Sequence, residues 1–325
     1  MIGRRAMVAG MVAIAVTAAA GCGSSNKGSG NGKKTYKLAF VQGVAGDAFY
    51  ITMACSVKAE AKKEGATVSV QGPKAFDPTQ QTPVLQSVIA SKPDAILIAP
   101  TDVSAMQQPI AQAKSQGIKI VLVDTTLKDP SVAVSAISSD NAAGGTAAFE
   151  AIKKLAPSGG KVLGIGVQPG VSTTDARDKG FADAAKADSK FSYLGVQYSM
   201  DEASKAASIA QAALQKNPDI VGIFASNLFA AEGAATGVRQ AGKQNSVKIV
   251  GFDAGSDQVK ALKDGTVQAL IAQQPGAIGT DGVQQAIKAL NGGKTTANIK
   301  TKFTIITKAN VDSAAGKAAE YKSAC

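Results

Sequence analysis

The stretch "KIVGFDAGSD", residues 248–257, joins a run of apolar residues directly to Asp253 and then to small residues. A second stretch, "KIVLVDTT" at residues 119–126, also ends an apolar run on an aspartate, Asp124. Continuous apolar runs of this length are typical of strands that are buried on both faces of a parallel sheet. Because a carboxylate has no use inside such a strand, we expect both aspartates at the point where the strand ends.

Similar short apolar runs alternate with amphipathic segments throughout residues 36–308. The runs that predict strands are "YKLAFVQG", "TVSVQ", "AILIAP", "IKIVLVD", "KVLGIGV", "SYLGVQY", "IVGIFAS", "KIVGFD" and "VQALIAQ". Strands that alternate with helices predict an α/β fold in which helices cover both faces of parallel sheets. The elements form two series of the same order, joined through residues 132–145, which predicts two similar lobes facing one another.

Composition excludes several classes of function. The chain has 325 residues, 45% of them hydrophobic, enough for two domains, and it contains no histidine. The missing histidine excludes Ser-His-Asp and Cys-His catalysis and any histidine-ligated metal. The net charge is +11, but the lysines are scattered among acids and form no basic stripe with aromatic residues, so we expect no nucleic-acid binding. No motif has the spacing of a metal or nucleotide site, and we expect no cofactor.

The first residues resemble an export signal. Arg4 and Arg5 precede a short apolar run, and "AAAGC" places small residues directly before Cys22. Residues 1–21 are therefore interpreted as a signal peptide, with lipid added to Cys22 as in a bacterial lipobox; ordinary secretory cleavage that leaves Cys22 unmodified is the alternative. Residues 22–35 are a Gly/Ser/Asn/Lys linker of the flexible kind. The protein is expected outside the cytoplasm, either anchored to the outer face of the cell membrane or periplasmic.

The two remaining cysteines are Cys55 and Cys325. Spare thiols often pair in an oxidising compartment, so a disulfide that fastens the C-terminal tail to the first helix is one hypothesis. Two unpaired thiols are the other.

The residues just past the ends of the predicted strands are mostly polar. In open parallel sheets, ligands bind beyond the carboxyl ends of the strands, so these residues are candidates for one cleft. They are Asp47, Asp102, Asp124, Arg177, Met200, Asn227, Asp253 and Gln273. Carboxylates only accept hydrogen bonds, whereas amides donate and accept, which suits a ligand with many hydroxyls. Phe49 and Tyr50 can cover the C–H faces of a sugar, so the set favours a neutral monosaccharide or polyol.

Eight motifs in a fixed order carry a family resemblance from Tyr36 to Lys308. They are "GDAFYITM", "DAILIAPTD", "IVLVDT", "SSDNAAGG", "ARDKGF", "SNLFAAEGA", "VGFDAG" and "ALIAQQPGAIG". In these the chain resembles the ribose-binding-protein family, type I periplasmic solute-binding proteins of ABC importers. The resemblance implies sugar contacts at Asp47, Phe49, Tyr50, Asp124, Arg177, Asn227, Asp253 and Gln273.

The chain departs from the ribose-binding pattern at several positions. Thr125 stands where an arginine is frequent, Asp47 replaces an asparagine, Leu228 replaces an acid, and Met200 replaces an aromatic residue. The pocket therefore has one cation fewer and one carboxylate more. We expect a polyol or a different pentose or hexose rather than ribose, with Thr125, Met200 and Asp102 as further candidate contacts.

Each candidate also has a purely structural interpretation. Asp47, Asp102 and Asp201 can cap helices, and Asp201 is interpreted as a cap alone. Arg177 can be an exposed helix residue, and Met200 can belong to the core.

The sequence thus predicts a monomeric lipoprotein that closes on a sugar or polyol and presents it to an ABC permease, without enzymatic activity. A sugar sensor coupled to a chemoreceptor or kinase is an alternative, as is a carbohydrate-active enzyme with Asp124 and Asp253 as paired acids. The expected organisation is residues 36–138 with 275–300 in the N-terminal lobe, 139–273 with 301–308 in the C-terminal lobe, and a tail over 309–325.

Overall fold

The computed structural model describes residues 35–325, which form one compact unit. The predicted signal peptide, Cys22 and the linker up to residue 34 lie outside the described residues. Within the described part of the chain, no helix is both long and apolar enough to cross a membrane.

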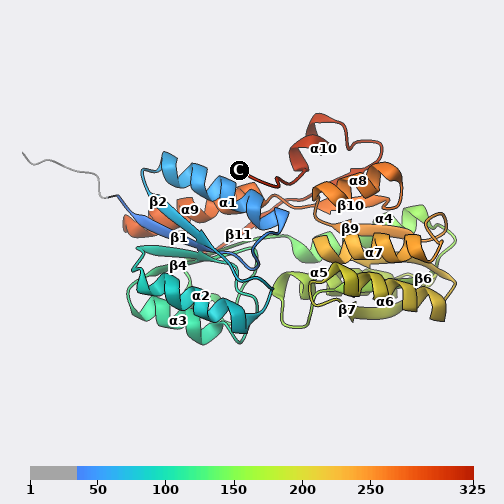
Figure 1. The fold of residues 1–325 in the computed structure, drawn as a ribbon, viewed down its shortest axis with the longest axis horizontal. Coiled ribbons are helices and arrows are strands. Elements are labelled where there is room, and N and C mark those ends of the chain that lie inside the picture. Colours follow the sequence, from blue (N-terminus) through green and yellow to red (C-terminus); the bar gives the residue numbers. More distant parts are fainter. Residues whose placement is uncertain (1–34) are drawn as a thin grey trace, which may run out of the picture. The chain divides into compact units, whose positions relative to one another are not determined.

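Two six-stranded sheets organise the described residues (Figure 1). The first sheet has the order β11-β5-β4-β3-β1-β2 and the second β12-β10-β9-β8-β6-β7. Neighbouring strands are parallel apart from β10 and β12, so the prediction of parallel sheets is confirmed with one antiparallel edge pair. The first sheet contains β1 (Lys37–Val41), β2 (Thr67–Gln71), β3 (Ala95–Ile98), β4 (Lys119–Val123), β5 (Ser135–Ser139) and β11 (Asn298–Thr301). The second contains β6 (Gly160–Gly166), β7 (Phe191–Tyr198), β8 (Ile220–Ala225), β9 (Lys248–Phe252), β10 (Ala269–Ala272) and β12 (Thr304–Thr307).

Helices cover both faces of each sheet. On the first sheet they are α1 (Ala48–Lys63) with α9 (Pro275–Leu290), and α2 (Pro78–Ala90) with α3 (Gln107–Ser115); a short 3₁₀ turn, η1 (Pro130–Val132), precedes β5. On the second they are α4 (Asn141–Leu155) with α5 (Ser172–Ala187), and α6 (Ala203–Lys216), α7 (Leu228–Gln240) and α8 (Ser256–Asp264). Successive side chains of a strand point to opposite faces. In β1, Leu38 therefore packs towards α1, whereas Ala39 packs towards α2.

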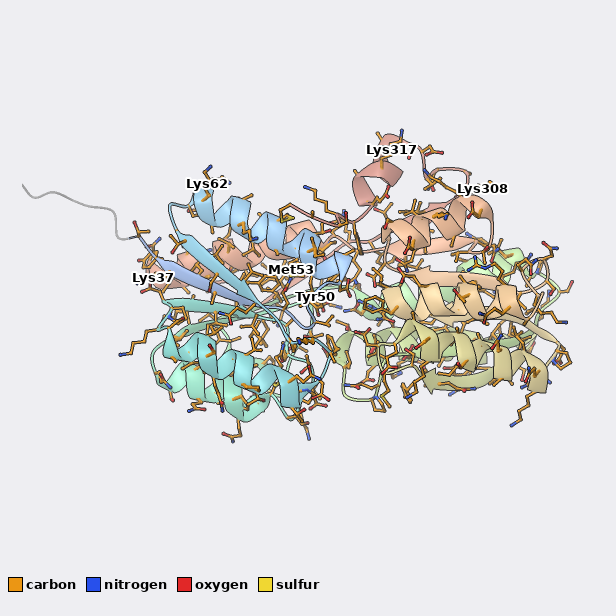
Figure 2. All side chains as sticks on the ribbon, viewed as in Figure 1. Lys37, Tyr50, Met53, Lys62, Lys308 and Lys317 are labelled. Carbon is orange, nitrogen blue, oxygen red and sulfur yellow. A yellow bond between two sulfur atoms is a disulfide. The ribbon has the colours of Figure 1, made fainter. Side chains whose placement is uncertain are left out.

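Helix α1 illustrates how the sequence pattern directs burial. Met53 is fully buried and Tyr50 is 3% exposed, while Lys62 near the end of the helix is exposed. Figure 2 shows Tyr50 and Met53 on the inner side of the helix and Lys62 on its outer side. This one-sided burial anchors the helix, so its first turn is held in place over the carboxyl ends of the strands.

The chain passes between the two sheets three times, from β5 to α4, from β10 to α9 and from β11 to β12. After β12 it forms the short helix α10 (Ala314–Ala319), which packs against β12. The last residues then reach α1, where Cys325 forms a disulfide with Cys55 and the two Cα atoms are 5.3 Å apart. The tail is therefore a further connection between the sheets.

Candidate functional site

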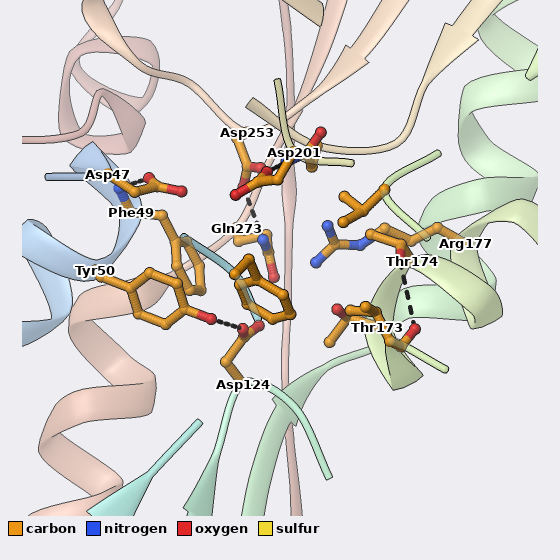
Figure 3. Close-up of a pocket in the computed structure, with 14 residues that line it drawn as sticks. Asp47, Phe49, Tyr50, Asp124, Thr173, Thr174, Arg177, Asp201, Asp253 and Gln273 are labelled. Atoms are coloured by element: carbon orange, nitrogen blue, oxygen red, sulfur yellow. Dashed lines mark hydrogen bonds between the residues drawn. The ribbon is translucent and has the colours of Figure 1, made fainter. Parts of the chain in front are cut away.

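A small cavity lies between the carboxyl ends of the two sheets (Figure 3). It is lined by Asp47, Phe49, Tyr50, Phe76, Asp124, Val167, Val171, Thr173, Thr174, Arg177, Asp201, Asn227, Asp253 and Gln273. The eight residues that the family resemblance implies as sugar contacts all lie in this set, and the strand-end argument also gives six of them. Asp102, Thr125 and Met200 do not lie in this set.

Asp124 and Asp253 occupy equivalent places in the two sheets. Each follows a buried strand, and the backbone N–H of each donates the last hydrogen bond of that strand, to the carbonyls of Ile137 and Ile271. Their φ angles are 63° and 77°, in the left-handed region, which aspartate tolerates better than most residues. This turn ends the alternation of the strand and directs both carboxylates into the cavity.

The first helix supplies one wall of the cavity. Asp47 caps α1, and its Oδ1 accepts a hydrogen bond of 2.7 Å from the backbone N–H of Phe49. Asp47 is therefore both a helix cap and a residue of the cavity lining. One turn further on, the Tyr50 hydroxyl donates to Asp124 Oδ2 at 2.7 Å. The rings of Phe49 and Tyr50 meet edge to face, with centroids 5.1 Å apart, and present an aromatic surface to the cavity.

Amide side chains organise the carboxylates of the second sheet. Gln273 Nε2 donates to Asp253 Oδ1 at 2.7 Å, and its Oε1 accepts from the Ser139 hydroxyl at 2.7 Å. Asn227 caps α7 through Ala230 N–H and donates its own Nδ2 to Asp201 Oδ1 at 2.6 Å. Each amide is therefore fixed by a neighbour, and it orients the carboxylate to which it donates, Asp253 or Asp201.

Arg177 is the only cation among the described residues that line the cavity. It is 3% exposed, so it is not the exposed helix residue that the alternative interpretation allowed. Its Nε donates to Asn141 Oδ1 at 2.8 Å, its Nη1 donates to the Ser226 carbonyl at 2.9 Å, and its guanidinium carbon lies 3.8 Å from the ring centre of Phe252. These contacts immobilise the guanidinium, which points into the cavity (Figure 3).

The cavity therefore holds four carboxyl groups and a single guanidinium. Burial raises the pKa of Asp124 to about 6, against the opposing charge of Arg177. Burial and the nearby charge of Asp253 raise the pKa of Asp201 to about 7. Burial, followed by the charges of Asp253 and Asp201, raises the pKa of Asp47 well above its usual range. The lining thus offers more hydrogen-bond acceptors than donors. In residues 35–325 no group of acidic or cysteine side chains is arranged to hold a metal ion.

Hydrogen bonds also join the two halves of the molecule beside the cavity. Val103 N–H donates to the Gly170 carbonyl at 3.0 Å, and Thr126 N–H donates to Ser172 Oγ at 2.9 Å. Gly170 has a φ of +91°, and a Cβ added there would lie 2.5 Å from Asp102 Oδ2. The structure is therefore a closed arrangement of the two lobes.

Three candidate contacts lie outside the lining set. Asp102 Oδ1 accepts from the N–H groups of Ser104 and Ala105, which stabilises a turn before α3 rather than capping that helix. Thr125 is buried, and its hydroxyl donates to the Pro100 carbonyl at 2.7 Å. Met200 is 46% exposed and is therefore not part of the core.

The interpretation of Asp201 as a helix cap alone is wrong. Helix α6 begins after Glu202, which gives no side-chain cap, and Asp201 lines the cavity in a left-handed conformation with a φ of 62°. The strand-end rule, taken one residue beyond Met200, would have found it. Five further lining residues were also missed. Val167 directly follows β6 but is apolar, Phe76 and Val171 lie further along the loops after β2 and β6, and Thr173 and Thr174 lie in the first turn of α5.

Comparisons with known proteins agree with this architecture. Residues 38–295 match the family described as periplasmic binding protein domain. The chain is 30% identical over 279 residues to the ribose import binding protein RbsB of Bacillus subtilis, covering 86% of this chain and 89% of that protein. It is 31% identical over 280 residues to RbsB of Escherichia coli, covering 86% and 93%.

Solved structures of solute-binding proteins also share this fold. An ABC transporter solute-binding protein from Agrobacterium vitis, with bound alpha-D-tagatopyranose, superposes with a TM-score of 0.87 at 40% identity, covering 89% of this chain and 100% of that one. A second solute-binding protein from that organism, with bound D-fucose, has a TM-score of 0.84 at 29% identity, covering 88% and 100%.

Proposed function

Because this chain belongs to the periplasmic binding protein domain family, we propose that it is the extracytoplasmic solute-binding protein of an ABC importer. It binds a monosaccharide or polyol between its two sheets and delivers that solute to a permease. The observation that carries the proposal is the meeting of oriented polar groups from both sheets in one buried cavity, above all Asp124 from one side and Asp253 with Arg177 from the other.

The chemistry of the lining supports a ligand rich in hydroxyls. Four carboxyl groups accept hydrogen bonds, and each charge-assisted bond contributes about 1.5–3 kcal/mol. Arg177, Asn227 and Gln273 supply donors to ring and hydroxyl oxygens. Phe49 and Tyr50 cover the apolar faces that a sugar ring also presents. The relatives with bound tagatose and fucose, and those named for ribose import, support a carbohydrate ligand.

The relatives named above are binding proteins, and the raised pKa values in the cavity have a cause that needs no catalysis. Burial and mutual repulsion between the carboxyl groups raise the pKa values of Asp47 and Asp201. Ligand hydroxyls relieve this, which favours the closed arrangement over the open one. The permease would then recognise the closed surface, and the hinge is formed by the segments between the sheets.

The location and the oligomeric state of the protein are further parts of this proposal. Lipid on Cys22 would hold the folded part at the outer face of the membrane through the linker, as a monomer. Mass spectrometry of the membrane-extracted protein tests the lipid, and light scattering tests the monomer.

A thermal-shift screen tests the function itself. The panel is D-ribose, D-allose, D-tagatose, D-fucose, D-arabinose and xylitol, because a ligand at a hundred times its dissociation constant adds about 2.7 kcal/mol to stability. Calorimetry then measures Kd, and chromatography shows whether the sugar is recovered unchanged. We expect at least one member to bind and none to be converted. Failure of sugars and polyols to bind the wild-type protein, or full binding by the Asp124→Asn/Asp253→Asn variant, would overturn the proposal.

A further inference from the structure

The segment after α10 contacts two residues of the cavity lining, Asp253 and Gln273, without lining the cavity itself. Tyr321 is 5% exposed, and its backbone N–H donates to the Ala254 carbonyl at 2.9 Å. Its hydroxyl donates to Asp253 Oδ1 at 3.0 Å and accepts from the backbone N–H of Gln273 at 2.9 Å. One buried side chain thus contacts both polar groups that the second sheet contributes near the hinge.

The same segment is fastened to the other lobe. The Tyr321 ring lies against that of Phe49, with centroids 5.9 Å apart. One residue later, Lys322 N–H donates to Thr52 Oγ1 at 2.7 Å, and Cys325 is bonded to Cys55. Phe49, Thr52 and Cys55 all belong to α1, the helix whose first turn lines the cavity.

The disulfide restricts the position of Tyr321, because few residues separate Tyr321 from Cys325. Three residues separate Tyr321 from Cys325, and an extended chain covers at most about 3.6 Å per residue. Tyr321 therefore stays within roughly 14 Å of the disulfide whatever the lobes do. Without the disulfide, the ring contact between Phe49 and Tyr321 and the hydrogen bond from Lys322 to Thr52 are left to hold this segment against α1.

We propose that Tyr321 is a positioning residue of the ligand site, and that the Cys55–Cys325 disulfide keeps it in place while the lobes open and close. Tyr321 orients the Asp253 carboxylate and the Gln273 backbone from behind, so the carboxylate keeps its remaining acceptor positions directed at the ligand. The inference rests on the proposed function, because Asp253 is there a ligand contact.

The first experiment compares Tyr321→Phe with Tyr198→Phe, a control on β7 outside the lining set. Each is titrated calorimetrically with whichever sugar of the panel binds the wild-type protein most tightly. We expect Tyr321→Phe to weaken binding about tenfold and Tyr198→Phe to leave it unchanged.

The pH dependence separates positioning from mere stabilisation of the fold. The Tyr321 hydroxyl lowers the pKa of Asp253, which burial raises and which the Arg177 charge opposes; Asp47, Asp124 and Asp201 face it as further acids. In Tyr321→Phe the loss of affinity on acidification should therefore begin at a higher pH. A variant with a lower melting temperature but wild-type affinity and an unshifted pH profile would overturn the inference.

The second experiment addresses the disulfide and needs no ligand. Amide hydrogen exchange at Gln273 is measured in the wild-type protein with and without dithiothreitol, and in Cys325→Ser. We expect faster exchange on reduction and in the variant, with no further effect of the reductant on the variant. Unchanged protection at Gln273 in both would overturn the role of the disulfide. A wild-type protein that binds none of the sugars refutes the proposed function instead, so the two failures are distinct.

Discussion

Asp124, Asp201 and Asp253 all hold left-handed backbone angles where they enter the cavity. Such a conformation costs about 1–2 kcal/mol in most residues and less in aspartate or asparagine, whose short side chains bond locally. Replacement by alanine would therefore change both the turn and the charge. Replacement by asparagine keeps the turn and removes the charge alone, which makes it the informative substitution at each of these positions.

Asp253→Asn should bind ligand more weakly while folding more stably. Removal of a buried carboxylate takes away charge-assisted acceptance worth about 1.5–3 kcal/mol, or roughly 10- to 150-fold in Kd. The same change removes repulsion from Asp47 and Asp201, so the melting temperature of the ligand-free protein should rise. Calorimetry and thermal denaturation check both effects, with the exposed Asp264→Asn as a control. A variant that loses stability and keeps its affinity would contradict the assignment.

Acidification should act oppositely on stability and on binding. The folded-state pKa values of Asp124 and Asp201, about 6 and about 7, exceed the unfolded value near 3.8, so the folded state binds more protons in that interval. The free energy of unfolding of the ligand-free protein should thus rise as pH falls from 7 towards 4, by up to about 1.4 kcal/mol per pH unit for each proton. Ligand hydroxyls form stronger hydrogen bonds with ionised than with protonated carboxyl groups, so Kd should increase over the same interval. Denaturation and calorimetry at each pH test the two signs.

At the scale of elements, two glycines allow α4 and α5 to approach closely. A Cβ on Gly145 would lie 2.0 Å from the Arg177 carbonyl, and one on Gly180 would lie 2.2 Å from the Ala142 carbonyl. Both neighbours are backbone atoms, which cannot move away by a change of side-chain rotamer. Helix α5, which carries Arg177, can therefore lie this close to α4 only because neither glycine has a side chain.

Gly145→Ala should lower both stability and affinity. The added methyl group must separate the helices, at a cost of about 1–3 kcal/mol, and the backbone of Arg177 is the atom group displaced. We expect a lower melting temperature and a higher Kd, measured on the same preparation. The exposed Ala143→Ser variant, on the same helix, should change neither. An unaltered Kd in Gly145→Ala would show that the placement of Arg177 does not depend on this contact.

At the scale of the whole molecule, the hydrogen bonds beside the cavity join two lobes that the proposed function requires to separate. The acceptor for Thr126 N–H is the Ser172 hydroxyl, on the opposite side of the cavity. Such a bond exists only in the closed arrangement, so it affects the rate of opening more than the fold of either lobe.

Ser172→Ala should release ligand several times faster with little change in melting temperature, since a single net hydrogen bond is worth about 0.5–1.5 kcal/mol. Stopped-flow displacement measures the dissociation rate. The control is Ser208→Ala, whose hydroxyl bonds only within its own helix. Equal dissociation rates in the wild type and Ser172→Ala would contradict a role for this contact in closure.

The sequence alone was enough to predict the fold class, the strands with strong apolar runs and eight lining residues, six of which both the strand-end rule and the family resemblance gave. These features are local, because an apolar run and the residue that follows it are neighbours in the chain. Strands β5, β11 and β12 escaped this approach. Their sequences "SAISS", "NIKT" and "TIIT" are short or polar, and they form strands because distant partners supply their hydrogen bonds.

Only the tertiary structure decided the contacts that join remote parts of the chain. Tyr321 meets Asp253 across 68 positions, and Cys325 meets Cys55 across 270. The charge balance of the cavity was decided in the same way, because it depends on which carboxyl groups the two sheets bring together. The physical reason is that such contacts depend on how the sheets close over one another and on the path of the tail, which no local pattern of residues encodes.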